Sequence, residues 1–153
     1  MTLFDAIRQQ SLSSAEKAIS QDPESVHRTD ERGFTPLILA TYLGNLPITS
    51  LLIDKGADIN ARDASGNTAL MGVCFKGNTD IGRLLLKNGA DVNIQNNSGA
   101  TALSFAATFG QKDMLNLLLA NGADKHVADE KGHTPFAQAQ MQGNQEIMRI
   151  LEN

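Results

Sequence analysis

The sequence predicts an all-α repeat solenoid, because several residue types share one spacing of 33 residues. Glycine keeps this spacing in three separate series, and threonine and leucine keep it in one series each. A fixed period of this length is typical of stacked supersecondary units, each of which buries its apolar face against the next. The members are Gly33, Gly66, Gly99 and Gly132; Gly44, Gly77, Gly110 and Gly143; Gly56, Gly89 and Gly122; Thr35, Thr68, Thr101 and Thr134; and Leu52, Leu85, Leu118 and Leu151.

Each unit is expected to begin with a short helix that follows a threonine. Thr35 can accept a hydrogen bond from the first free helical amides, and Pro36 at the first helical position gives up only an amide that has no partner. Ala69 and Ala102 take the place of Pro36 in the next two units, so we expect these helix starts to be slightly less firm. The glycine series that begins at Gly44 is expected to end this helix in the left-handed conformation.

A second helix is expected in each unit, because apolar residues follow at helical spacing. These residues are Ile48, Leu51 and Leu52; Ile81, Leu84 and Leu85; and Met114, Leu117 and Leu118. The glycine series from Gly56 closes this helix. The Asp-x-x-Gly segments that open the next units fit tight hairpins whose glycine has a positive φ. Each unit is therefore expected to be a helix-turn-helix with a short β-hairpin finger.

The segment from Asp30 to Leu37 carries a resemblance to a known family. It reads Asp-Glu-Arg-Gly-Phe-Thr-Pro-Leu, and with Gly44 and the Gly-Ala-Asp triplet at Gly56 it resembles the ankyrin repeat. The pattern returns from residue 63, from residue 96 and, in part, from residue 129. We therefore expect one ankyrin repeat domain over residues 1–153, with full repeats at 30–62, 63–95 and 96–128, an N-terminal capping repeat at 2–29 and a C-terminal capping repeat at 129–153.

Both ends of the array carry polar residues at positions that stack in the inner repeats. Gln138 takes the position of Leu39, Gly72 and Phe105, and Glu152 takes that of Ile53, Leu86 and Leu119. In the first repeat, polar residues also stand where an inner repeat would contact a neighbour, namely Arg8, Ser14 and Lys17. This repeat keeps the 33-residue frame but lacks the turn of the other repeats. Counting back 33 residues places Thr2, Ala18 and Ile19 opposite Thr35, Leu51 and Leu52. We expect capped ends, a monomer and a whole protein rather than a fragment.

Composition narrows the possible functions. The net charge of −4 and the pI near 5.3 argue against nucleic-acid partners, which require a basic face. No run of apolar residues reaches the length of a membrane span, and the first residues do not resemble an export signal. The single cysteine, Cys74, excludes an internal disulfide and fits a reducing compartment. We expect a cytoplasmic protein that binds neither nucleic acid nor membranes.

The resemblance implies that partners bind to the finger tips and to the exposed ends of the first helices, on the concave face. We expect an apolar strip at these helix ends, because aromatic residues recur there. The alternative is that the rings lie flat against the neighbouring repeat and widen the core. The candidate partner-binding residues are Arg32, Phe34, Tyr42, Leu43, Asn67, Phe75, Lys76, Thr108, Phe109 and Met141.

Signatures of catalysis and of metal or cofactor binding are absent from the sequence. His126 and His133 flank one finger, where ordinary surface residues are the better interpretation than a metal site. Cys74 is expected to be a buried, unreactive thiol. His126 also replaces the asparagine found at Asn60 and Asn93, so we expect a looser last finger. The sequence thus favours a non-catalytic protein-binding module, with a dedicated inhibitor or immunity protein, or an enzyme with an unrecognised site, as alternatives.

Overall fold

The structure, a computed structural model, describes residues 1–152. Within this range the chain forms ten α-helices and one short 3-10 helix, η1. They are α1 (Leu3–Arg8), α2 (Leu12–Gln21), η1 (Pro23–His27), α3 (Pro36–Tyr42), α4 (Leu46–Asp54), α5 (Ala69–Lys76), α6 (Thr79–Lys87), α7 (Ala102–Thr108), α8 (Lys112–Ala120), α9 (Pro135–Met141) and α10 (Gln145–Glu152).

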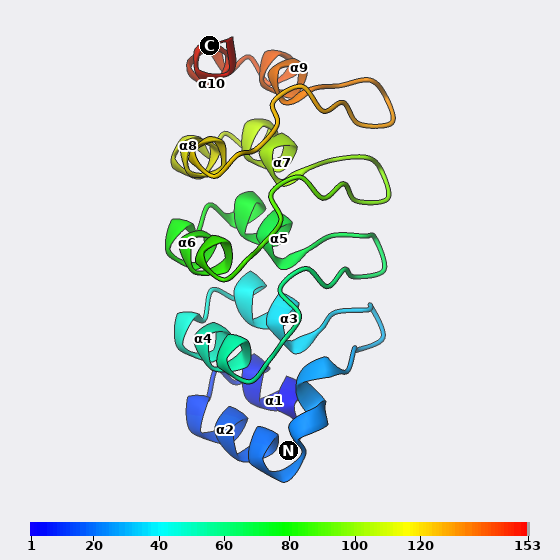
Figure 1. Ribbon diagram of the computed structural model, residues 1–153, viewed down its shortest axis with the longest axis vertical. Coiled ribbons are helices and arrows are strands. Elements are labelled where there is room, and N and C mark those ends of the chain that lie inside the picture. The colour runs from blue at the N-terminus through cyan, green and yellow to red at the C-terminus, as the bar shows by residue number, and fades with distance from the viewer. Residues whose placement is uncertain (153) are drawn as a thin grey trace.

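The helices form two parallel stacks, with the fingers projecting to one side (Figure 1). The inner stack contains α1, α3, α5, α7 and α9, and each of these helices packs against the next. The outer stack contains α2, α4, α6, α8 and α10, and each outer helix packs against the inner helix of its own repeat. One continuous apolar core runs between the stacks, and the all-α repeat solenoid predicted from the sequence is confirmed.

The helix starts form as predicted, because a threonine side chain caps every inner helix. The Oγ1 of Thr35 accepts from the backbone N–H of Ile38 at 3.1 Å, and Pro36 occupies the first turn. The corresponding distance is 3.4 Å at Thr68, where alanine replaces the proline. The turn glycines also behave as predicted: all three series have positive φ, for example 76° at Gly44 and 89° at Gly56.

The first repeat departs from the predicted frame. Ser11 caps α2 as Asn45 caps α4, but Ser11 lies nine positions after Thr2, whereas Asn45 lies ten positions after Thr35. The spacing to the second repeat therefore changes from 33 to 34 residues within the first helix pair, and Ala18 corresponds to Leu52. The sequence-based alignment was wrong here because alanine and isoleucine in α2 fit either spacing.

The fingers contain no β-strand anywhere in residues 1–152, so the expected β-hairpins are tight turns instead. Asp63 Oδ1 accepts from the backbone N–H groups of Ser65 and Asn67, both at 2.9 Å. Successive fingers share one backbone bond, such as that from the N–H of Ala64 to the carbonyl of Arg32. A single bond between neighbours holds the fingers in register without forming a ladder.

Asparagine side chains tie each repeat to the next. Asn60 accepts from the backbone N–H of Asp91 at 2.9 Å and donates to the carbonyl of Gly89 at 3.4 Å, and Asn93 repeats this pattern one repeat later. Asn60 therefore fixes the following loop, not its own finger. The expectation of a looser last finger assumed the wrong contact, because Asp129 Oδ1 accepts from the N–H groups of Lys131 and His133, both at 2.9 Å, as Asp63 does in its own finger.

The two ends carry polar contacts, although not all of them are fully exposed. Arg8, Lys17 and Glu152 are exposed, whereas Gln138 is half-buried. Gln138 donates to Asp129 Oδ2 at 3.2 Å, which folds its amide back onto the last finger. Lys112 and Glu146 form an ion pair of 2.6 Å that links the last two repeats.

Candidate functional site

The ends of the inner helices carry an exposed apolar strip. Tyr42, Leu43, Phe75, Phe109 and Met141, here called the inner-helix strip, expose 37–54% of their surface. They make up five of the eight large apolar residues that are exposed within residues 1–152. The strip was predicted from the aromatic residues, and its exposure agrees with that prediction.

The rings of the strip also contact one another. The centroids of Phe75 and Phe109 lie 4.6 Å apart in an edge-on arrangement, and Phe105 stacks on Phe109 at 6.3 Å. The ammonium of Lys76 lies 4.7 Å from the centre of the Tyr42 ring. Mutual packing of this kind fixes the rings in place and leaves more than a third of Tyr42, Phe75 and Phe109 exposed. The rings therefore extend the core, as the alternative from the sequence expected, and still present apolar surface.

Three predicted residues are less exposed than expected. Phe34 and Thr108 are half-buried, and Phe34 packs against the core with the guanidinium of Arg32 4.3 Å above its ring. Asn67 is half-buried because its Oδ1 accepts from Asn96 Nδ2 at 2.8 Å. Phe34 and Asn67 thus lie at the base of a finger rather than on its tip.

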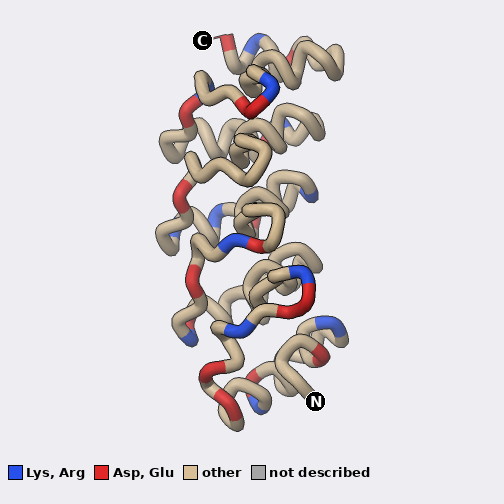
Figure 2. The backbone as a smooth tube through the Cα atoms, turned by 90° about the vertical axis from the view of Figure 1, so that its right-hand side faces the viewer, with Lys and Arg blue, Asp and Glu red and all other residues tan. Residues whose placement is uncertain are grey.

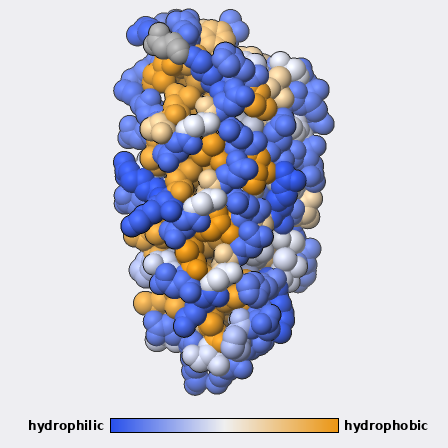
Figure 3. All heavy atoms as spheres, viewed as in Figure 1, coloured by the Kyte–Doolittle hydropathy of each residue, from blue (hydrophilic) through white to orange (hydrophobic). Residues whose placement is uncertain are grey.

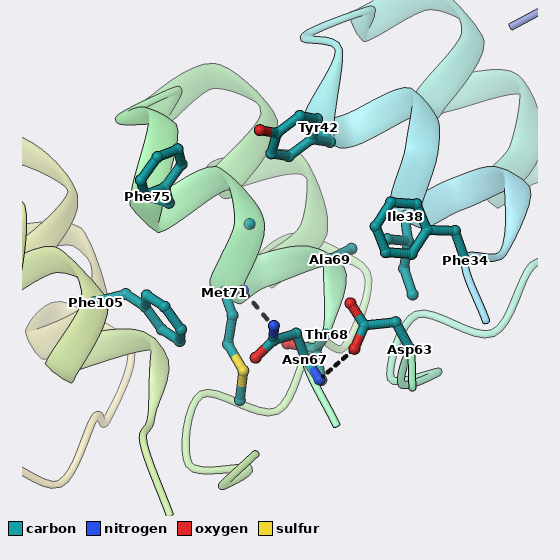
Figure 4. Close-up of a pocket in the computed structure, with 11 residues that line it drawn as sticks. Phe34, Ile38, Tyr42, Asp63, Asn67, Thr68, Ala69, Met71, Phe75 and Phe105 are labelled. Carbon is teal, nitrogen blue, oxygen red and sulfur yellow. Dashed lines mark hydrogen bonds between the residues drawn. The ribbon is translucent and has the colours of Figure 1, made fainter. Parts of the chain in front are cut away.

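A pocket of about 160 Å³ joins four of the predicted residues, Phe34, Tyr42, Asn67 and Phe75. Figure 4 shows Tyr42 and Phe75 at one end of the pocket and Asp63 and Asn67 at the other. Leu43, Lys76, Thr108, Phe109 and Met141 do not line it. The pocket was not predicted. Its sequence signal is Gly72, which also lines it and stands where the neighbouring repeats have Leu39 and Phe105.

Charges of both signs occur on the fingers. Viewed from the finger side in Figure 2, basic and acidic residues lie close together on the tips, and residues 96–100 form an uncharged finger. The carboxylate of Asp30 lies 3.6 Å from Arg32. Figure 3 shows a different feature, an apolar band that follows the long axis over the helices. The fingers thus supply a mixed polar edge, and the helices supply the apolar surface.

The described residues contain no set of three or more His, Cys, Asp or Glu side chains that could hold a metal ion. His133 Nδ1 lies 4.0 Å from Asp129, and the backbone N–H of His133 lowers the pKa of that carboxyl. Cys74 is fully buried, and this burial raises the pKa of its thiol. A thiol that stays protonated and inaccessible is a poor nucleophile, as expected from the sequence. Within residues 1–152, no helix combines the length and apolar character needed to cross a bilayer.

Comparison with known proteins places these features in a family. A curated relative, ankyrin repeat and SAM domain-containing protein 6 of Rattus norvegicus, is 34% identical over 61 residues, which cover 40% of this chain and 7% of that protein. The Mus musculus protein of the same name matches to the same extent. The chain thus matches only a small part of these relatives. The sequence model for ankyrin repeats in three copies matches residues 3–96 and 88–153. This chain belongs to the ankyrin repeat family, whose members are generally protein-protein interaction modules.

Proposed function

We propose that this chain is a non-catalytic binding module that docks a protein partner along its inner-helix strip. The observation that carries this proposal is the concentration of exposed apolar side chains on the strip. Apolar surface gathered in one place marks a contact site more often than scattered apolar residues do, and aromatic side chains dominate the energy of such contacts.

The dimensions of the strip suit a single segment of a partner. Inner helices are stacked about 10 Å apart, so the strip from Tyr42 on α3 to Met141 on α9 is about 30 Å long. This length matches a helix of about five turns or an extended segment of about nine residues. Exposed charge at Arg8, Lys17 and Glu152 disfavours stacking of a second copy on either end, so we propose that the chain acts as a monomer.

A pair of charge variants tests the strip. Leu43→Glu combined with Met141→Glu places two carboxylates on the strip, and Leu12→Glu combined with Leu46→Glu places two on the outer helices at similarly exposed leucines. Both variants have the same net charge, and both are expected to unfold within a few degrees of the parent. Only the strip variant is expected to lose its partner, by about 100-fold or more, because unpaired carboxylates must be desolvated on binding.

The measurement is affinity capture from the native cell with mass spectrometry, followed by a dissociation constant for the captured protein. Thermal unfolding of both variants is recorded in parallel. Equal capture by the two variants would show that partners bind elsewhere on the molecule.

A further inference from the structure

The pocket beside the inner-helix strip exists because one side chain is missing from the repeat pattern. Leu39 on α3 and Phe105 on α7 occupy the position that Gly72 holds on α5. Phe105, Tyr42 and Phe75 line the resulting space, whose volume is about 160 Å³. The void therefore lies where a leucine or phenylalanine of α5 would be.

Gly72 has no backbone reason to be glycine. It lies inside α5 and is not among the residues with positive φ. A Cβ atom added there would meet only the Cδ1 of Tyr42, at an ordinary distance of 3.9 Å. Glycine inside a helix lowers the stability of the fold relative to alanine, so Gly72 costs stability, and its one structural effect is the empty space beside it.

The walls of the pocket are mainly apolar. Rings of Phe34, Tyr42, Phe75 and Phe105 surround it, with Met71 beside them (Figure 4). A cavity of about 150 Å³ lined by aliphatic and aromatic side chains is known to stay dry and to accept benzene. A space of this size and lining thus fits one side chain such as leucine, methionine or phenylalanine.

Charged groups at the two ends of the pocket give it a direction. At the finger end, Asp63 Oδ1 accepts two backbone N–H groups, and Oδ2 has no partner among residues 1–152. At the helix end, the ammonium of Lys76 lies over the Tyr42 ring and pairs with no carboxylate in the same range. Arg32, over the Phe34 ring, already has Asp30 nearby. A carboxylate on an occupant is thus favoured beside Lys76 and disfavoured beside Asp63.

We propose that the Gly72 pocket receives one large apolar side chain of a partner protein, and that an acidic residue close to this anchor pairs with Lys76. This proposal rests on the function proposed above, because the pocket shares Tyr42 and Phe75 with the inner-helix strip. The anchor enters between the two rings, and the partner backbone continues along the strip.

A random peptide library displayed on phage is the probe, selected against the whole protein. Bound peptides are expected to share a leucine, methionine or phenylalanine with an aspartate or glutamate a few residues away. A synthetic peptide of this kind is expected to shift the NMR signal of the Met71 methyl group, because Met71 lines the pocket. A library without binders, or binders that leave this signal unmoved, would overturn the proposal.

Filling the pocket provides the sharper test. Gly72→Leu restores the residue type found at Leu39 and is expected to raise the melting temperature, since it removes a helix glycine and fills a void. The same change is expected to weaken the selected peptide by roughly 10- to 100-fold, the value of burying one large apolar side chain. If the leucine variant does not fold, Gly72→Ala takes its place in the binding measurement, because the added Cβ atom fits there without a clash.

Two controls separate this proposal from the function on which it rests. Lys87→Leu adds the same side chain to an exposed site on α6 and is expected to leave binding unchanged. Replacing the anchor residue of the peptide by alanine is expected to lower its affinity for the parent protein as much as Gly72→Leu does. The same peptide change is expected to cause no further loss of affinity for the Gly72→Leu variant. If Gly72→Leu binds like the parent while the strip variant does not, the pocket proposal fails and the strip proposal stands. If both bind like the parent, both fail.

Discussion

The inner and terminal repeats of this protein are held together by different kinds of contact. Between inner repeats the same bonds recur, namely one backbone bond per finger and a pair of bonds from Asn60 and again from Asn93. The finger bond continues into the C-terminal repeat, from the N–H of Glu130 to the carbonyl of Ser98. The other contacts of the terminal repeats are individual: Arg28 pairs with Asp22 and Gln138 bonds Asp129 within one repeat each, and Lys112 pairs with Glu146 across the last interface. The middle of the array is thus held by bonds that recur from repeat to repeat, and each end adds contacts that occur only there.

This difference follows from what each repeat has to contact. An inner repeat meets a copy of itself on both sides, so one residue type at one position can serve every interface. A terminal repeat meets a copy on one side only, and the positions that would stack are free to vary. Departures from the 33-residue spacing are therefore expected at the ends, and the shift between Thr2 and Ser11 lies there.

The largest expected effect is a difference in unfolding free energy between two variants, one at a finger glycine of an inner repeat and one at a finger glycine of a terminal repeat. Gly66 and Gly132 have nearly the same φ, 79° and 82°. A Cβ on Gly66 would come within 2.8 Å of the backbone N of Asn97, whereas nothing lies within 4 Å of one on Gly132. Gly132→Ala is expected to cost about 1 kcal/mol through backbone strain alone, and Gly66→Ala about 3 kcal/mol because the next finger must also move.

Chemical unfolding of the two alanine variants measures this difference. Equal losses of unfolding free energy would mean that the fingers are independent turns and that the shared backbone bonds between them carry no stability.

The helix and turn positions could be predicted because their causes are local. Thr35 caps, Pro36 starts a helix, and Gly44 takes a conformation that other residues avoid, whatever their neighbours are. The exposure of Phe75 and Phe109 followed from the same frame.

Contacts between repeats could not be predicted in this way. The Gly72 pocket depends on where rings of α3 and α7 lie, and the direction of the Asn60 bonds depends on the next loop. Phe34 was predicted to be exposed on the first finger, and its partial burial could not be foreseen because it depends on Arg32 and on the core beneath the ring. The shortening of α1 by one residue relative to α3 left no mark in the apolar pattern, since Ala18 and Ile19 fit both alignments.

A smaller effect is expected from the asparagine contacts. Asn60→Ala removes both bonds to the following loop and is expected to lower the unfolding free energy by about 1–2 kcal/mol, since its partners are exposed enough to rebind water. His126→Ala, at the equivalent position of the last full repeat, is expected to change it by no more than about 0.5 kcal/mol. Hydrogen exchange at the amide of Asp91 reports the contact directly, and protection that survives in Asn60→Ala would contradict the assigned role.

The smallest expected effect is a gain in stability at the N-terminal end. Gln10 has a φ of 55° and occupies the turn position that Gly44 holds in the second repeat, where φ is 76°. A residue with a Cβ atom is strained in this conformation, and glycine is not. Gln10 is exposed, so its side chain contributes little packing that could be lost. Gln10→Gly is therefore expected to raise the unfolding free energy by about 0.5–1 kcal/mol, and Gly44→Gln to lower it by about the same amount. Thermal and chemical unfolding of both variants gives the comparison. A destabilised Gln10→Gly variant would show that the first turn depends on the glutamine side chain, and that its correspondence with Gly44 is superficial.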